Sequence, residues 1–274
     1  MTVADAGAER TAPARSLPTA AAAGLGVGVL GGLIGLGGAE FRLPLLIAVF
    51  GFLALQAVIV NKAMSLIVVA TALPARLAEV PPAEVVGHWT VVANLLAGSL
   101  AGAWLGATWA TGMASGTLYR ILAALLVVIA AALAANHAGV VPAADLPVVA
   151  QVPAGVLAGV VIGVVAAIMG VAGGELLIPT IVLLYAVDVK PAGSLSLAVS
   201  LPTMLVAFAR YSRDGSFEVL GANRGFVGAM ALGSVAGSAL GGLLLGVVPA
   251  AVVVPLLVAL LLGSSVKVWQ HRHD

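Results

Sequence analysis

The chain has 274 residues, of which 62% are hydrophobic and only 8% are charged, and its formal net charge is +1. Soluble domains carry about 25% charged residues, so this composition excludes an ordinary soluble globular protein. The small net charge leaves no basic patch for nucleic acid. The absence of cysteine excludes disulfides, thiolate metal sites and cysteine nucleophiles.

The first half begins with residues 1–18, which are polar and small, and which we expect to form a disordered cytoplasmic tail. Apolar segments of roughly 15–22 residues follow, long enough to cross or nearly cross a bilayer core about 30 Å thick. They are apolar on every face, whereas the strands of a membrane barrel alternate polar and apolar residues. The sequence therefore predicts an all-α polytopic membrane protein. Its first transmembrane repeat covers residues 19–136, with segments at about 20–36, 43–55, 60–78, 89–110 and 117–136.

The second half follows a linker, residues 137–153, that contains no lysine or arginine. The N-terminal tail contains Arg10 and Arg15, so the positive-inside rule predicts a cytoplasmic tail and an extracytoplasmic linker. We expect a second transmembrane repeat over residues 154–269 and a cytoplasmic tail over 270–274. The apolar segments of this half lie at about 152–169, 176–187, 192–209, 225–246 and 249–266.

The two halves repeat each other at an offset of 135 residues, which places Glu40 on Glu175 and Pro44 on Pro179. These matches carry weight because charged residues are scarce in this chain. The opposite locations of the tail and the linker require an odd number of crossings per half. Most basic residues, Lys62 among them, then fall on the cytoplasmic side. We therefore predict two inverted-topology repeats of about five apolar segments each.

Glycines at four-residue spacing recur in the fourth apolar segment of each half. Small residues at this spacing let two membrane helices approach closely, so we expect them at helix contacts. They are Gly98, Gly102 and Gly106, and Gly233, Gly237 and Gly241.

A glutamate follows a glycine-rich stretch in each half, in "GLGGAEFRLP" (35–44) and "GVAGGELLIP" (170–179). A carboxylate near the bilayer centre costs on the order of 3 kcal/mol, so it needs a compensating environment. Glycines permit a helix break, and a proline four residues later sets φ for the first turn of the next helix. We expect helix, break, glutamate and new helix in both halves, which is the pattern typical of a transporter's substrate site. The positive N-termini of the new helices favour an anion.

The second apolar segment of each half is short, about 13 residues, or roughly 20 Å of helix. A tilted span, a broken span and the return arm of a re-entrant hairpin all fit this length, and the alternatives stay open.

Glu40 and Glu175 have two interpretations. They cap the helices that start near Phe41 and Leu176, because carboxylates stabilise N-terminal turns. Alternatively they handle substrate or protons, which we favour because serine would cap at less cost. A carboxylate beside an anion repels it unless it is protonated, so our hypothesis is that one glutamate carries a proton during transport.

These motifs resemble those of the sulfite exporter TauE/SafE family of membrane permeases. The second-half run "VDVKPAGSLSLAVSLPTMLVAFARYSRDG" (187–215) is similar too, and the resemblance extends from Ala20 to Trp269. It implies transport of small sulfur-containing anions such as sulfite or organosulfonates. The first half departs from the pattern, because "AVIVNKAMSL" (57–66) places Asn61 and Lys62 opposite Ser196 and Leu197.

Polar side chains near the motifs are the further candidates for the substrate site. Serine hydroxyls suit sulfite or sulfonate oxygens, but helix-to-helix hydrogen bonds explain them equally well. For Lys62 we favour a side chain that reaches the cytoplasmic interface, and Arg42 either neutralises Glu40 or holds substrate. The full set is Gly37, Gly38, Glu40, Asn61, Lys62, Ser65, Gly173, Gly174, Glu175, Ser194, Ser196 and Ser200, with Pro44 and Pro179 at the helix breaks.

The sequence thus predicts an alternating-access permease in the inner cell membrane, with a small anion and the lipid bilayer as partners. No His/Cys/Asp cluster suggests an enzyme, a metal site or a cofactor. The alternative is a cation pathway that uses the glutamates as ligands. Coupling to protons or sodium, the direction of transport and homo-oligomer formation stay open.

Overall fold

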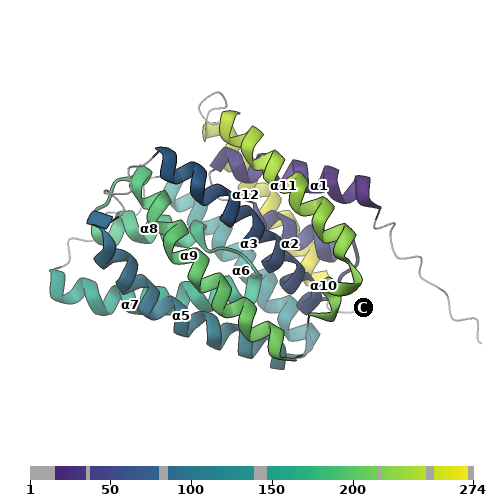
Figure 1. The fold of residues 1–274 in the computed structure, drawn as a ribbon, viewed down its shortest axis with the longest axis horizontal. Coiled ribbons are helices and arrows are strands. Elements are labelled where there is room, and N and C mark those ends of the chain that lie inside the picture. Colours follow the sequence, from purple (N-terminus) through teal and green to yellow (C-terminus); the bar gives the residue numbers. More distant parts are fainter. Residues whose placement is uncertain are drawn as a thin grey trace, which may run out of the picture.

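The computed structural model describes residues 16–34, 38–79, 86–138, 147–214, 217–244 and 250–270, and these contain helices and no strand (Figure 1). Most of the expected N-terminal tail, residues 139–146 of the expected linker, and all but one residue of the expected C-terminal tail lie outside the described residues. The helices of the first half are α1 (Leu17–Ile34), α2 (Ala39–Ala48), α3 (Ala54–Glu79), α5 (Trp89–Gly112) and α6 (Ser115–His137). Those of the second half are α7 (Val148–Met169), α8 (Gly174–Tyr185), α9 (Val189–Tyr211), η1 (Ser212–Asp214), α10 (Glu218–Ala222), α11 (Arg224–Leu244) and α12 (Ala250–Gln270).

Each expected apolar segment is a helix, which confirms the all-helical prediction. Several bounds differ: α2 covers Ala39–Ala48 where 43–55 was expected, α3 begins at Ala54 where 60 was expected, and α7 begins at Val148, inside the stretch expected to be linker. The short helices η1 and α10, which the sequence did not predict, precede α11. Six helices in the described part of the chain are long and apolar enough to cross a membrane, namely α3, α5, α6, α7, α9 and α11.

The helices α2 and α8 are the short elements of the fold. They have 10 and 12 residues, about 15 and 18 Å at 1.5 Å per residue. Neither length crosses a hydrocarbon core about 30 Å thick.

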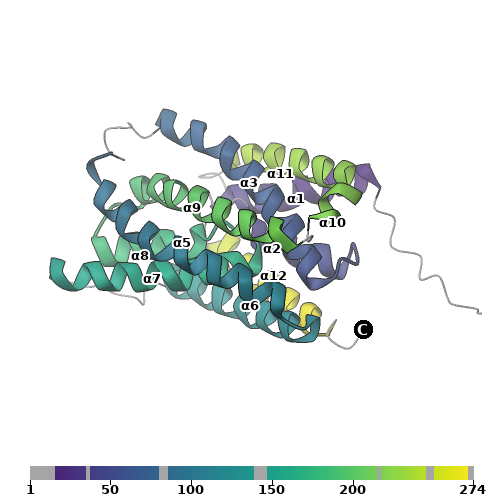
Figure 2. The ribbon, with the colours of Figure 1, turned by 60° about the horizontal axis from the view of Figure 1, so that its bottom comes forward.

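The first helix of each half packs along the fourth helix of the other half, as Figures 1 and 2 show for α1 with α11 and α5 with α7. Glycines permit this contact: a Cβ on Gly102 would meet the Val160 backbone of α7, and one on Gly237 would meet the Leu25 and Val29 backbone of α1. The expected role of the spaced glycines in close helix packing is therefore confirmed. Helices α6 and α12 also pack together.

Gly28 and Gly26 of α1 provide a matched test of this packing. A Cβ on Gly28 would lie 2.9 Å from the Ser238 amide nitrogen and 3.0 Å from the Gly237 Cα, whereas nothing lies within 4 Å of one on Gly26. Gly28→Ala is expected to destabilise the detergent-solubilised protein by about 1–3 kcal/mol through overpacking. Gly26→Ala is expected to be neutral or stabilising by up to about 1 kcal/mol, because alanine favours helix. Thermal melts followed by tryptophan fluorescence measure both, and equal shifts would contradict the packing argument.

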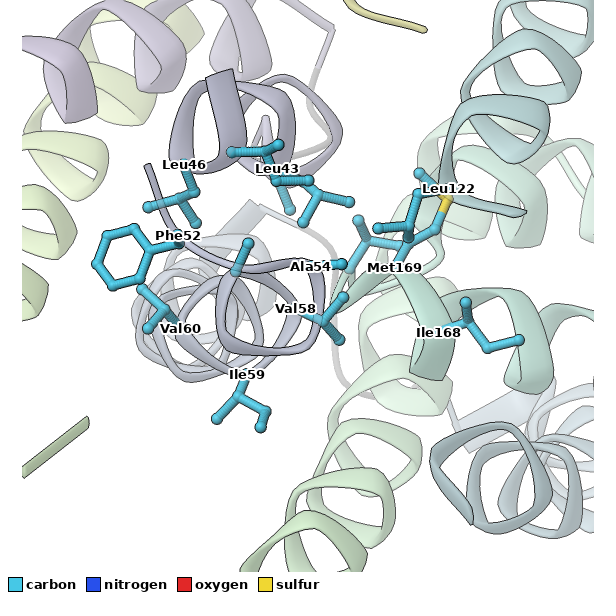
Figure 3. Packing of buried hydrophobic residues seen from close by; sticks show 14 of the residues in the cluster. Leu43, Leu46, Phe52, Ala54, Val58, Ile59, Val60, Leu122, Ile168 and Met169 are labelled. Atoms are coloured by element: carbon cyan, nitrogen blue, oxygen red, sulfur yellow. The ribbon is translucent and has the colours of Figure 1, made fainter. Parts of the chain in front are cut away.

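A buried apolar cluster surrounds the junction of α2, α3, α6 and the end of α7. Figure 3 shows Ala54 and Val58 on the side of α3 that faces Met169 of α7 and Leu122 of α6. Leu43 of α2 belongs to the same cluster. This packing holds the C-terminal end of α7 against the first turns of α3.

Candidate functional site

Glycines in the left-handed backbone conformation mark both helix breaks. Gly170 ends α7 with φ 70, Gly173 precedes α8 with φ 85, and Gly38 precedes α2 with φ 72. This conformation is strained for residues with a Cβ, so the glycines are needed at these turns. The expected sequence of helix, break and helix is therefore present in the second half. In the first half, α1 ends at Ile34 and α2 begins at Ala39, while Gly37 lies outside the described residues.

The glutamates occupy the same position in both short helices. Helix α2 begins at Ala39 and α8 at Gly174, so Glu40 and Glu175 are each the second residue of a helix. The expected starts near Phe41 and Leu176 were thus wrong by two residues. Both glutamates therefore lie in a first turn, where an acidic side chain interacts favourably with the positive end of the helix dipole.

The prolines lie in the second turn, which corrects the expectation that they set the first turn. Pro44 and Pro179 are inside α2 and α8, each four residues after a glutamate. Proline has no amide hydrogen, so it cannot donate to the carbonyl four residues earlier. The backbone carbonyls of Glu40 and Glu175 therefore lose their helical partner. Each glutamate therefore combines a buried carboxyl group with a carbonyl that lacks the usual donor four residues later.

The fold brings the two glutamates together, one from each half. Glu40 is 1% exposed. Its carboxyl group lies close enough to that of Glu175 for the two charges to interact. All four carboxyl oxygens are buried, and none has a hydrogen-bond partner among the described residues. Two adjacent carboxylates in a buried site repel each other unless a proton or a cation lies between them.

Arg42 introduces a buried positive charge two residues after Glu40. Its side chain is 0% exposed, and its three guanidinium nitrogens have no hydrogen-bond partner in the described part of the chain. Its charge interacts with that of Glu40, but no ion pair with hydrogen-bonding distance joins them among these residues. Buried arginines are almost always paired, so a buried guanidinium without a partner among the described residues is unusual.

Lys62 lies in the core rather than at an interface, contrary to our expectation for its side chain. It is 0% exposed, and Nζ donates to the Ala166 carbonyl at 2.7 Å and to the Val171 carbonyl at 2.8 Å. These oxygens belong to the last turn of α7 and to the break that follows it. The ammonium charge also interacts with Glu175. Lys62 therefore no longer supports the positive-inside argument.

Three more side chains satisfy the carbonyls at this break. Asn61 donates from Nδ2 to the Met169 carbonyl at 3.2 Å and to the Ala39 carbonyl of α2 at 2.9 Å, which links both halves. Ser65 donates to the Gly170 carbonyl at 3.3 Å. Tyr211, which the sequence did not single out, donates to the Ala167 carbonyl at 3.0 Å. Irregular backbone at membrane depth is tolerated when such partners are present.

The serines of α9 divide into two kinds. Ser196 donates to the Gly193 carbonyl of its own helix at 2.8 Å. Ser194 and Ser200 are buried and have no side-chain partner among the described residues, so they stay candidate ligands. Ser99 and Thr203, which the sequence analysis missed, form a 2.7 Å hydrogen bond between α5 and α9.

The described residues contain no group of three histidine, cysteine or acidic side chains that could hold a metal ion. Residues 20–268 match the protein-family model described as sulfite exporter TauE/SafE. Searches of curated proteins and of solved structures found no match. Because the family match covers nearly the whole chain and the helices suit a multi-pass membrane protein, the chain belongs to the sulfite exporter TauE/SafE family of membrane permeases.

Proposed function

We propose that this permease transports small sulfur-containing anions, such as sulfite or organosulfonates, across the inner cell membrane, with both termini in the cytoplasm. The observation that carries the proposal is the fully buried Arg42 guanidinium without a partner among the described residues. A guanidinium binds two oxygens of an oxyanion through parallel N–H bonds. The family match supports the same class of substrate.

The balance of buried charges supports proton coupling. Glu40 lies near Arg42, and Glu175 lies near Lys62, so the four side chains sum to zero when all are ionised. A monovalent anion adds one negative charge to this buried set, which is costly away from water. A proton on one glutamate removes that charge and relieves the repulsion between the two carboxylates. We therefore propose that anion and proton move together.

The helix contacts between the two halves support an inverted repeat whose halves move relative to each other. Helices that correspond at the 135-residue offset have corresponding partners: α1 packs on α11, and α7 packs on α5. The basic residues of the tail and their absence from the linker support opposite orientations of the two halves. Alternating access then rocks the halves around the two glutamates.

A cation pathway is the second candidate, and the oxygens at each break favour it. The carboxyl group of each glutamate, and its carbonyl without a donor four residues later, are hard ligands of the kind that alkali and alkaline-earth cations prefer. The presence of Arg42 beside one of these glutamates argues against it, because a like charge repels a cation.

Flux into proteoliposomes separates the candidates. Purified protein is expected to take up labelled sulfite from a sodium-free medium at a rate well above protein-free liposomes, and excess organosulfonate is expected to compete. Sodium uptake is expected to stay at the background rate. Sodium flux without sulfite flux would overturn the proposal in favour of the cation pathway.

A further inference from the structure

The ammonium group of Lys62 occupies a nest of backbone carbonyls at the end of α7. Its Nζ lies 2.7 Å from the Ala166 oxygen and 2.8 Å from the Val171 oxygen, and the side chain is 0% exposed. These oxygens stand at the negative end of the α7 dipole. Glu175 adds a carboxylate whose charge interacts with that of Lys62. The nest is therefore built for a cation.

Transporters with broken helices use such carbonyls for coupling ions. Unwound backbone and the C-terminal ends of half-helices coordinate Na⁺ near the bilayer midplane. In this chain a covalently attached ammonium fills the corresponding place at the second break. We propose that Lys62 is a tethered substitute for a coupling cation, so that transport needs no sodium at this break. This inference rests on the proposed function only where its test measures sulfite transport.

A structural hydrogen bond alone does not explain a lysine here. The neighbouring carbonyls at the same break accept from neutral donors, namely Asn61, Ser65 and Tyr211. Burying an ammonium costs several kcal/mol more than burying an amide or a hydroxyl. The corresponding position on α9 is Leu197, so the repeated architecture does not itself demand a charge. The lysine therefore places an amine that can carry a positive charge where a neutral donor would satisfy the backbone.

A tethered cation has a consequence for the transport cycle. A free Na⁺ at this break would bind and leave with each cycle and would link flux to the sodium gradient. The Lys62 ammonium stays with α3 throughout. The glutamate pair then remains as the group that exchanges an ion with water, and the exchanged ion is a proton.

Lys62→Ala tests the inference in two ways. The variant is expected to have at least tenfold lower sulfite flux than the natural protein in choline chloride, and sodium chloride at equal ionic strength is expected to restore part of it. In detergent, sodium is also expected to raise the melting temperature of Lys62→Ala by several degrees. The natural protein is expected to respond to sodium in neither measurement.

Lys62→Gln separates charge from hydrogen bonding, because glutamine keeps a donor and lacks the charge. It is expected to fold and to lose flux at least tenfold; flux equal to that of the natural protein would overturn the inference. Lys267→Ala, which removes an exposed lysine from α12, is the control and is expected to show no sodium response.

Two further results bear on the inference. Sodium-dependent flux by the natural protein, or full flux by Lys62→Ala in choline, would overturn it. The melting measurement needs no substrate. If sodium stabilises Lys62→Ala and not the natural protein, and the natural protein transports no sulfite, this inference holds and the proposed function fails.

Discussion

Arg42→Met is expected to lower sulfite flux on the order of 100-fold without lowering the melting temperature. The flux falls because two charge-assisted hydrogen bonds to an oxyanion contribute about 3 kcal/mol or more. The stability holds because the guanidinium has no hydrogen bond to lose among the described residues. Methionine also fills a similar volume without the cost of burying a charge. Uptake in proteoliposomes and thermal melts in detergent measure the two effects.

Arg224→Gln provides the control for this pair of measurements. Arg224 is exposed at the start of α11, and its loss is expected to leave flux unchanged. A melting temperature that falls by many degrees in Arg42→Met, together with normal flux in the surviving protein, would show that Arg42 serves the fold and not the substrate.

Glu175→Gln is expected to uncouple sulfite flux from the proton gradient. Glutamine keeps the size of the side chain, but it cannot exchange a proton. In the natural protein, a proton gradient in the direction of the sulfite gradient is expected to accelerate flux several-fold. In Glu175→Gln the rates with and without the proton gradient are expected to be equal. Rapid-mixing flux measurements at matched external pH give both rates.

Glu40→Gln completes the experiment, since the hypothesis requires only one of the two neighbouring glutamates to carry the proton. Glu218→Gln, at an exposed position on α10, is expected to behave as the natural protein does. If both Glu40→Gln and Glu175→Gln keep the full pH dependence, the carboxyl pair does not carry the proton.

Local sequence rules located the helix breaks well, because the backbone there needs residue types that few other positions need. Gly38 and Gly173 have positive φ, and glycine followed by glutamate and proline indicated a break before any contact was known. The same rules misplaced the helix starts. The helices begin before the glutamates because a first turn accepts an acidic residue directly and tolerates proline in the next turn.

The partners of individual polar residues were harder to predict from the sequence than the proximity of these residues to the helix breaks. Lys62 resembled a residue that reaches the interface, since a lone lysine in an apolar segment usually does so. Its actual partners are carbonyls 104 and 109 residues away. Tyr211 gave no signal at all, because its partner is one backbone oxygen of a distant helix.

The sequence by itself determined the membrane class, the duplication and the two glycine–glutamate breaks, because composition, repeat offset and backbone conformation are properties of nearby residues. The inverted orientation stays a prediction from charge placement. Only the tertiary structure decided that α1 pairs with α11, that Glu40 meets Glu175, and that α3 supplies the donors for the end of α7. The physical reason is that apolar helices in a membrane carry little information on their faces about which partner they will contact, and close packing between distant segments makes that choice.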